Sequence, residues 1–224
     1  MTTEVKICGI NTAEAMQSTL DAGADYVGLV FFERSPRNVD LATARMLADM
    51  ARARLQVIAL VVDADDALLE AIAREVAPHL IQLHGKETPK RANDVRRQFG
   101  IPVMKAVSVA GPDDVHGALA YDGFVDRLLF DAKPRADEPG ALPGGNGVAF
   151  DWQALAAVER DANDLLADCI LAGGLTPENV AEAVRLTGVR AVDVSSGVES
   201  SPGVKDAERI RRFISAAKTA NQTP

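Results

Sequence analysis

Hydrophobic residues occur in short continuous runs, and after each run they recur every three to four positions. Continuous apolar runs rich in β-branched residues predict buried strands, and the 3.6-residue spacing predicts helices. Eight runs predict strands that begin at Val5, Tyr26, Gln56, Leu80, Val103, Arg127, Cys169 and Ala191. The helices predicted after them cover Asn11–Ala22, Leu41–Met50, Ala67–Val76, Pro89–Phe99, Gly111–Tyr121, Trp152–Asp161, Thr176–Leu186 and Asp206–Lys218.

The strand starts are evenly spaced along the chain. They lie 21 to 30 residues apart, except for one interval of 42 residues. A strand and its crossover helix need about this length, so eight units predict an α/β protein with a single (β/α)8 TIM barrel over residues 1–224. The alternative, a doubly wound open sheet, uses five or six strands and leaves two units unexplained. No linker or low-complexity segment divides the chain, which favours one domain.

Composition narrows the class of protein. The formal net charge is -8, which is the wrong sign for a surface that binds nucleic acid. Two distant cysteines, Cys8 and Cys169, are typical of thiols in a reducing compartment. The first residues lack the pattern of a signal peptide, and no apolar run is long enough to cross a bilayer. We therefore expect a cytoplasmic protein, monomeric or homodimeric, that binds neither nucleic acid nor membranes.

The 42-residue interval contains a segment without helical period. Between Asp131 and Val148 the chain is rich in Pro and Gly. A loop of this length after the sixth strand of a barrel predicts a mobile lid at the C-terminal face, where barrel enzymes bind their substrates. The alternative is a surface insertion without a role in binding.

Two reactive side chains end predicted strands. Cys8 closes the first strand and Asp131 closes the sixth. Because inward positions alternate along a strand, both should face the barrel mouth, as a candidate general base and general acid. The base role requires that Lys6 or helix N-termini lower the pKa of Cys8, and the acid role requires that burial keep Asp131 protonated. Taken singly, each residue is also explained by packing or by a turn.

Glycine-rich segments follow the last three predicted strands. Backbone N–H groups approach a phosphate closely only where side chains are absent, and barrel enzymes bind phosphate in the loops after strands seven and eight. One segment alone is explained by a tight turn, but three at one mouth predict a phosphate site. The segments are Gly144-Gly145-Asn146-Gly147, Gly173-Gly174 and Ser195-Ser196-Gly197.

Other polar residues complete the candidate site. The Arg37 guanidinium can hold a planar carboxylate with two parallel hydrogen bonds. His84, just after the fourth strand, is a substrate contact or a loop residue that is hydrogen-bonded internally. Lys6 lies two residues before Cys8 and therefore faces the same side of the strand. It either forms a Schiff base in an aldolase-like lyase or is held by a carboxylate such as Asp193. We count Asp193 with the binding residues. No Cys, His or carboxylate spacing indicates a metal site.

Several of these motifs together resemble one known family. The chain is similar to phosphoribosylanthranilate isomerases, enzymes of tryptophan biosynthesis, in the motifs KICGI (6–10), SPR (35–37), QLHG (82–85), LLFD (128–131), LAGGLTPENV (171–180) and DVSSGVE (193–199). The resemblance runs in order from Lys6 to the last helix. Two positions depart from the family: Ala132 stands where a hydroxyl residue often follows the acid, and Asn146 where threonine is common. They leave the details of these loops open.

The resemblance implies a reaction and a role for each candidate. It implies a cofactor-free and metal-free barrel that converts N-(5'-phosphoribosyl)anthranilate to 1-(o-carboxyphenylamino)-1-deoxyribulose 5-phosphate by an acid/base Amadori rearrangement. Cys8 is then the general base and Asp131 the general acid, Arg37 binds the anthranilate carboxylate, and the glycine segments bind the phosphate. Two alternatives remain open at this point: a lyase that uses Lys6 and a non-catalytic sugar-phosphate binder.

Overall fold

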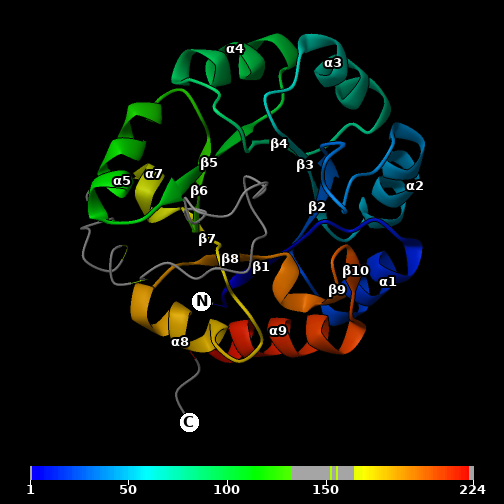
Figure 1. The fold of residues 1–224 in the computed structure, drawn as a ribbon, viewed down its shortest axis with the longest axis vertical. Helices are drawn as coiled ribbons and strands as arrows, with labels where there is room; N and C mark the ends of the chain where they lie inside the picture. The colour runs from blue at the N-terminus through cyan, green and yellow to red at the C-terminus, as the bar shows by residue number, and fades with distance from the viewer. Residues whose placement is uncertain (1, 133–151, 153–154, 156–163, 222–224) are drawn as a thin grey trace.

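The computed structural model describes residues 2–132, 152, 155 and 164–221. Eight parallel strands close into a barrel in chain order, and the eighth strand pairs with the first (Figure 1). The predicted (β/α)8 barrel is therefore confirmed. Its strands are β1 (Glu4–Cys8), β2 (Tyr26–Phe31), β3 (Gln56–Val61), β4 (Leu80–Leu83), β5 (Val103–Val109), β6 (Arg127–Ala132), β7 (Ile170–Leu171) and β8 (Ala191–Val194).

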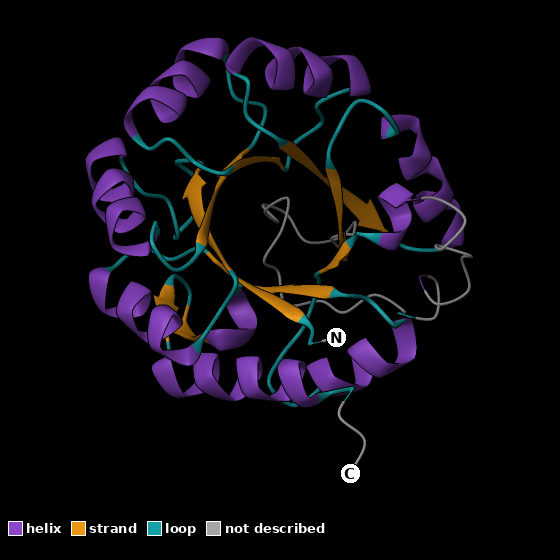
Figure 2. Cartoon of the chain, turned by 180° about the vertical axis from the view of Figure 1, so that it is seen from behind, coloured by secondary structure: helices purple, strands orange, loops and turns teal. Residues whose placement is uncertain are grey.

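Helices surround the barrel as an outer ring (Figure 2). They are α1 (Ala13–Ala22), α2 (Leu41–Ala51), α3 (Asp66–Glu75), α4 (Pro89–Phe99), α5 (Pro112–Gly117), α7 (Asp164–Ala167), α8 (Val180–Thr187) and α9 (Ala207–Thr219), with the 3-10 helices η1 (Ala118–Tyr121) and η3 (Ser196–Val198). Five of the helices begin at a Thr or Asp whose side chain accepts a backbone N–H in the first turn: Thr12, Asp40, Asp65, Thr88 and Asp206. None of the helices in the described ranges is long and apolar enough to cross a membrane.

Two sequence predictions differ from the structure, and one element was not predicted. The helix predicted from Thr176 begins instead at Val180, because the Asn179 side chain accepts the Thr176 N–H at 2.7 Å and closes a turn first. A short hairpin of β9 (Glu199–Ser201) and β10 (Val204–Lys205) was not predicted, since such brief strands carry too few residues for a periodic pattern. The helix predicted over Gly111–Tyr121 is divided into α5 and η1.

The predicted lid and the helix expected over 152–161 lie, except for Trp152 and Leu155, outside the described residues. Both stay predictions.

Side-chain parity divides the core into two regions. Outward-facing strand residues pack with the helices in the larger cluster, whereas inward-facing residues fill the barrel. A separate inward-facing cluster, at the C-terminal ends of the strands, consists of Cys8, Val30 and Leu60. This parity places Cys8 inside the barrel near its C-terminal end, as the sequence predicted.

Candidate active site

Cys8 lies at the end of β1 with a glycine beside it on the neighbouring strand. The register pairs Cys8 with Gly28 of β2. A Cβ at position 28 would lie 2.8 Å from Cys8 Sγ, which is closer than Cβ atoms approach other atoms in proteins, and 3.2 Å from Lys6 Nζ, which is tighter than most such contacts. The absence of a side chain on Gly28 therefore leaves the space that the Cys8 thiol occupies.

A buried ion pair lies directly below the thiol. Lys6 Nζ and Asp193 Oδ1 are 2.9 Å apart, and both side chains are buried. Although burial opposes the charge, Asp193 and Cys8 raise the pKa of Lys6, so this residue is an ammonium group rather than a free amine. The expectation that Asp193 holds Lys6 is confirmed.

The electrostatics of Cys8 differ from the sequence expectation. Burial, reinforced by the Asp193 charge, raises the pKa of the thiol, and the nearby Lys6 and Lys205 ammonium groups only partly offset this effect. Lys6 thus acts in the direction that the base role requires, but the net pKa of Cys8 in the free protein is raised, because desolvation is the largest effect. At neutral pH the free protein holds Cys8 as a thiol.

Asp131 lies across the barrel on β6, next to His84. Its Oδ1 accepts the backbone N–H of Ala132 at 2.8 Å, and its Oδ2 lies 3.5 Å from His84 Nε2. His84 Nδ1 is 2.8 Å from the Gln82 amide nitrogen. When Gln82 donates to Nδ1, the ring proton is on Nε2 and faces Asp131. The structure thus places His84 against the candidate acid.

A cavity of about 190 Å³ opens beside this pair. Its wall combines polar and apolar side chains. The lining residues are His84, Gly85, Lys105, Ala106, Val107, Ser108, Tyr121 and Asp131. The cavity therefore brings the candidate acid into contact with space that a small molecule can enter.

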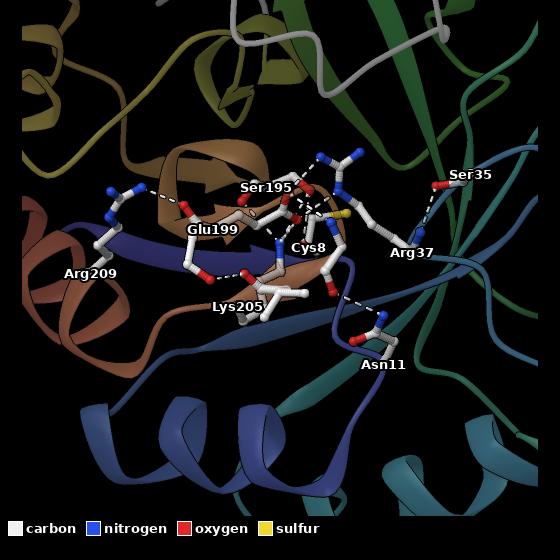
Figure 3. Close-up of polar contacts among 11 residues, drawn as sticks. Cys8, Asn11, Ser35, Arg37, Ser195, Glu199, Lys205 and Arg209 are labelled. Carbon is white, nitrogen blue, oxygen red and sulfur yellow. Dashed lines mark hydrogen bonds and ion pairs between the residues drawn. The ribbon is translucent and has the colours of Figure 1, made fainter.

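Arg37 is buried and held by a carboxylate that sequence reasoning missed. Its Nε and Nη2 donate to the two carboxylate oxygens of Glu199 at 2.7 and 2.8 Å (Figure 3). Nη1 makes no hydrogen bond to a residue that the structure describes, so Glu199 holds only one edge of the guanidinium. Despite burial, hydrogen bonds from Arg37 and Lys205 lower the pKa of Glu199, which is therefore charged. Glu199 is the last residue of the DVSSGVE motif, and this motif was the sequence signal that could have identified it as a site residue.

Gly9 of the KICGI motif has a clear structural role. Its φ is +79°, and a Cβ at this position would lie 2.6 Å from Arg37 Cδ. The left-handed backbone favours glycine, and the missing side chain allows Arg37 to cross the end of β1. Cys8 and Arg37 are thereby held close to each other.

Two of the three glycine-rich segments lie together at the barrel mouth. Gly173 and Gly174 follow β7 with φ values of +80° and +65°. Ser195, Ser196 and Gly197 follow the neighbouring strand β8 and form the start of η3. A Cβ on Gly197 would collide with the carbonyl oxygen of Leu175, so the two loops are in contact.

The third segment, with Gly144, Gly145, Asn146 and Gly147, lies outside the described residues. Among the residues that the structure does describe, no group of His, Cys, Asp and Glu is arranged to hold a metal ion.

Comparison with known proteins agrees with this geometry. Residues 5–216 match the family model described as N-(5'phosphoribosyl)anthranilate (PRA) isomerase. The chain belongs to this family. A relative with the name N-(5'-phosphoribosyl)anthranilate isomerase, from Rhodopseudomonas palustris (strain BisA53), is 51% identical over 222 residues, which are 99% of each chain.

Solved structures of the family have the same fold. A phosphoribosyl anthranilate isomerase in complex with reduced 1-(o-carboxyphenylamino)-1-deoxyribulose 5-phosphate has a TM-score of 0.81 and 33% identity, with 96% of this chain and 98% of that chain covered. Monomers generated from the dimeric enzyme of Thermotoga maritima have a TM-score of 0.80 and 34% identity, with the same coverage. Both likenesses span nearly the whole chain.

Proposed function

We propose that this chain converts N-(5'-phosphoribosyl)anthranilate to 1-(o-carboxyphenylamino)-1-deoxyribulose 5-phosphate in tryptophan biosynthesis, with Cys8 as general base and Asp131 as general acid. One observation carries the assignment of roles. A thiol and a carboxylate face the same barrel mouth from β1 and β6, in a chain that belongs to the isomerase family.

The reaction begins with two proton transfers, at two atoms that are both bonded to C1'. Asp131 in its protonated form donates to the furanose ring oxygen, the bond from C1' to that oxygen breaks, and a Schiff base forms. The Cys8 thiolate then removes the proton from C2', which gives an enolamine with a hydroxyl on C2'. Loss of that hydroxyl proton and protonation of C1' give the ketone, and exchange with solvent restores Asp131 and Cys8. No atoms are gained or lost.

The two ends of the substrate have separate binding groups. We assign the anthranilate carboxylate to the other edge of Arg37, whose orientation Glu199 maintains. We assign the phosphate to backbone N–H groups of the Gly173-Gly174 and Ser195–Gly197 segments, with residues 144–147 as a third contributor. Binding at both ends positions the C1' and C2' atoms between base and acid.

Asp193 and His84 act next to these groups. We assign Asp193 to the placement of Lys6 below the thiol, and His84 to the placement of Asp131 and to contact with the substrate. A lyase that works through a Schiff base on Lys6 is disfavoured, because the ion pair with Asp193 keeps the nitrogen protonated and removes its nucleophilic lone pair.

The location and assembly of the protein are also proposals. We expect a cytoplasmic enzyme that is a monomer or a homodimer, and the Thermotoga maritima relative is described as dimeric. Sedimentation equilibrium of the purified chain distinguishes the two states.

Turnover tests the proposed function directly. The anthranilate-linked substrate is fluorescent, so purified protein should consume it with loss of that signal, and the product should co-elute with the synthetic ketone. Binding of the substrate without turnover would instead support the non-catalytic binder. Covalent trapping on Lys6 by borohydride would support the lyase.

A further inference from the structure

The β9–β10 hairpin lies against the loops that carry the candidate base and the substrate-binding arginine. Gly203 in its turn has a φ of +81°, and a Cβ there would lie 2.5 Å from the carbonyl oxygen of Pro36. The Gly203 carbonyl accepts a hydrogen bond from the Asn11 amide at 3.1 Å (Figure 3). The hairpin is therefore in contact with both the loop after β1 and the loop after β2.

Lys205 of β10 extends from this hairpin into the site. Its side chain is 0% exposed, although burying a lysine is costly unless its ammonium group is paired. Nζ donates to Glu199 Oε1 at 2.7 Å and to the Ser195 carbonyl oxygen at 2.9 Å. The Ser195 hydroxyl donates in turn to the carbonyl oxygen of Cys8 at 3.1 Å. Lys205 is thus joined to both Arg37 and Cys8 through one intermediate residue each.

The buried charges around Cys8 do not balance when it is a thiol. Among the described residues, the buried charged side chains that face it or its neighbours are two carboxylates and three cations: Asp193 on β8, Glu199 on β9, Lys6 on β1, Arg37 after β2 and Lys205 on β10. Arg209, which donates to the Glu199 carbonyl oxygen, is exposed, so solvent screens its charge. Their sum is one positive charge. Ionisation of the thiol brings this sum to zero, and an unbalanced buried charge is costly. The third cation therefore favours the thiolate and partly offsets the effect of burial, which still keeps Cys8 protonated in the free protein at neutral pH.

We propose that Lys205 is a positioning residue of the isomerase site, which stabilises the Cys8 thiolate and holds Glu199 so that Arg37 keeps its orientation. Its part in the reaction rests on the proposed function. Burial lowers the pKa of Lys205, while Glu199 and Cys8 counteract this effect and favour its charged form. The Lys205 ammonium group and the Cys8 thiolate therefore favour each other's charged form.

The first test measures the ionisation of Cys8 without turnover. Iodoacetamide alkylates the thiolate, and mass spectrometry of the Cys8 peptide gives the alkylation rate. The pH at which this rate is half its maximum is the midpoint for thiolate formation. Lys205→Gln keeps a hydrogen-bond donor but removes the charge, so the midpoint should rise by about one pH unit. Lys205→Arg should leave it close to wild type. An unchanged midpoint in folded Lys205→Gln overturns the proposal.

Two further variants separate charge from structure. Glu199→Gln removes a negative charge from the same network, so it should shift the midpoint downward, opposite to Lys205→Gln. A structural disturbance would move the midpoints of the two variants in the same direction, and that result also overturns the proposal. Lys105→Met is the matched control, because Lys105 is an equally buried lysine in an ion pair with Glu87. It should leave the Cys8 midpoint unchanged.

The second test uses turnover. Since the base acts as a thiolate, kcat/KM rises with pH through the Cys8 pKa, and Lys205→Gln should move this rise to higher pH. Activity near pH 7 should fall about tenfold and recover in alkaline buffer and in Lys205→Arg. An equal loss at every pH overturns the thiolate role. If the wild type shows no isomerase turnover while the alkylation midpoint shifts as expected, the proposed function fails and the inference about Lys205 and Cys8 stands.

Discussion

Substitution of Gly28 by alanine tests the spatial relation between β1 and β2 at the candidate base. The new Cβ would lie 2.8 Å from Cys8 Sγ and 3.1 Å from Cys8 Cα. Favourable contacts need about 3.5–4.0 Å, so the sulfur has to move by about 1 Å or the strands have to separate. Displacement of a reacting group by this distance costs about 10²-fold in rate. We therefore expect kcat to fall by about 10²-fold.

The same substitution should also lower stability. Extra volume in a packed core costs about 1–3 kcal/mol, which corresponds to a decrease in Tm of about 2–12 °C for a chain of this length. An assay that follows the loss of substrate fluorescence gives kcat, and calorimetry gives Tm. Gly117→Ala is the control, because a Cβ there meets nothing within 4 Å, and both values should stay near wild type or Tm should rise slightly. Normal kcat in Gly28→Ala would refute the argument that this space positions the thiol.

Three further predictions concern the acid, the base and the arginine network. Cys8→Ser and Asp131→Asn should each lower kcat by about 10²-fold or more with little change in binding of the reduced product analogue, and near-normal turnover would remove that residue from its role. Arg37→Met should weaken calorimetric binding of this analogue by about 1.5–3 kcal/mol while inorganic phosphate binding persists; equal affinity for the analogue would show that the carboxylate binds elsewhere. Because the pKa of Glu199 is lowered in the folded state, its stabilising effect is present above its unfolded pKa near 4.5 and is lost as pH falls through the folded value. The Tm difference between wild type and Glu199→Gln should thus disappear in strong acid, and a difference that is constant with pH would contradict this assignment.

Local sequence was sufficient to predict the barrel strands. In a parallel barrel both faces of each strand are covered, so the strands appear as continuous apolar runs such as YVGLVF, which forms β2 over Tyr26–Phe31. Alternation along each strand then determined which residues face the interior, and this placed Cys8 and Asp131 at the mouth without knowledge of any contact. The limits of local reasoning appear at Thr176, where the Asn179 side chain delays the helix.

The sequence by itself therefore determined the architecture, the inward-facing positions and the motifs that carry the family resemblance, because these depend on periodicity and residue type over short distances. The tertiary structure decided which charges meet. Arg37 and Glu199 are 162 residues apart, and Lys6 and Asp193 are 187 apart, yet each pair is in direct contact. It also decided the direction of the Cys8 pKa shift, since burial outweighs the attraction of Lys6 and Lys205. Such a balance depends on the solvent excluded and on all neighbouring charges at once, and only closure of the barrel brings these together.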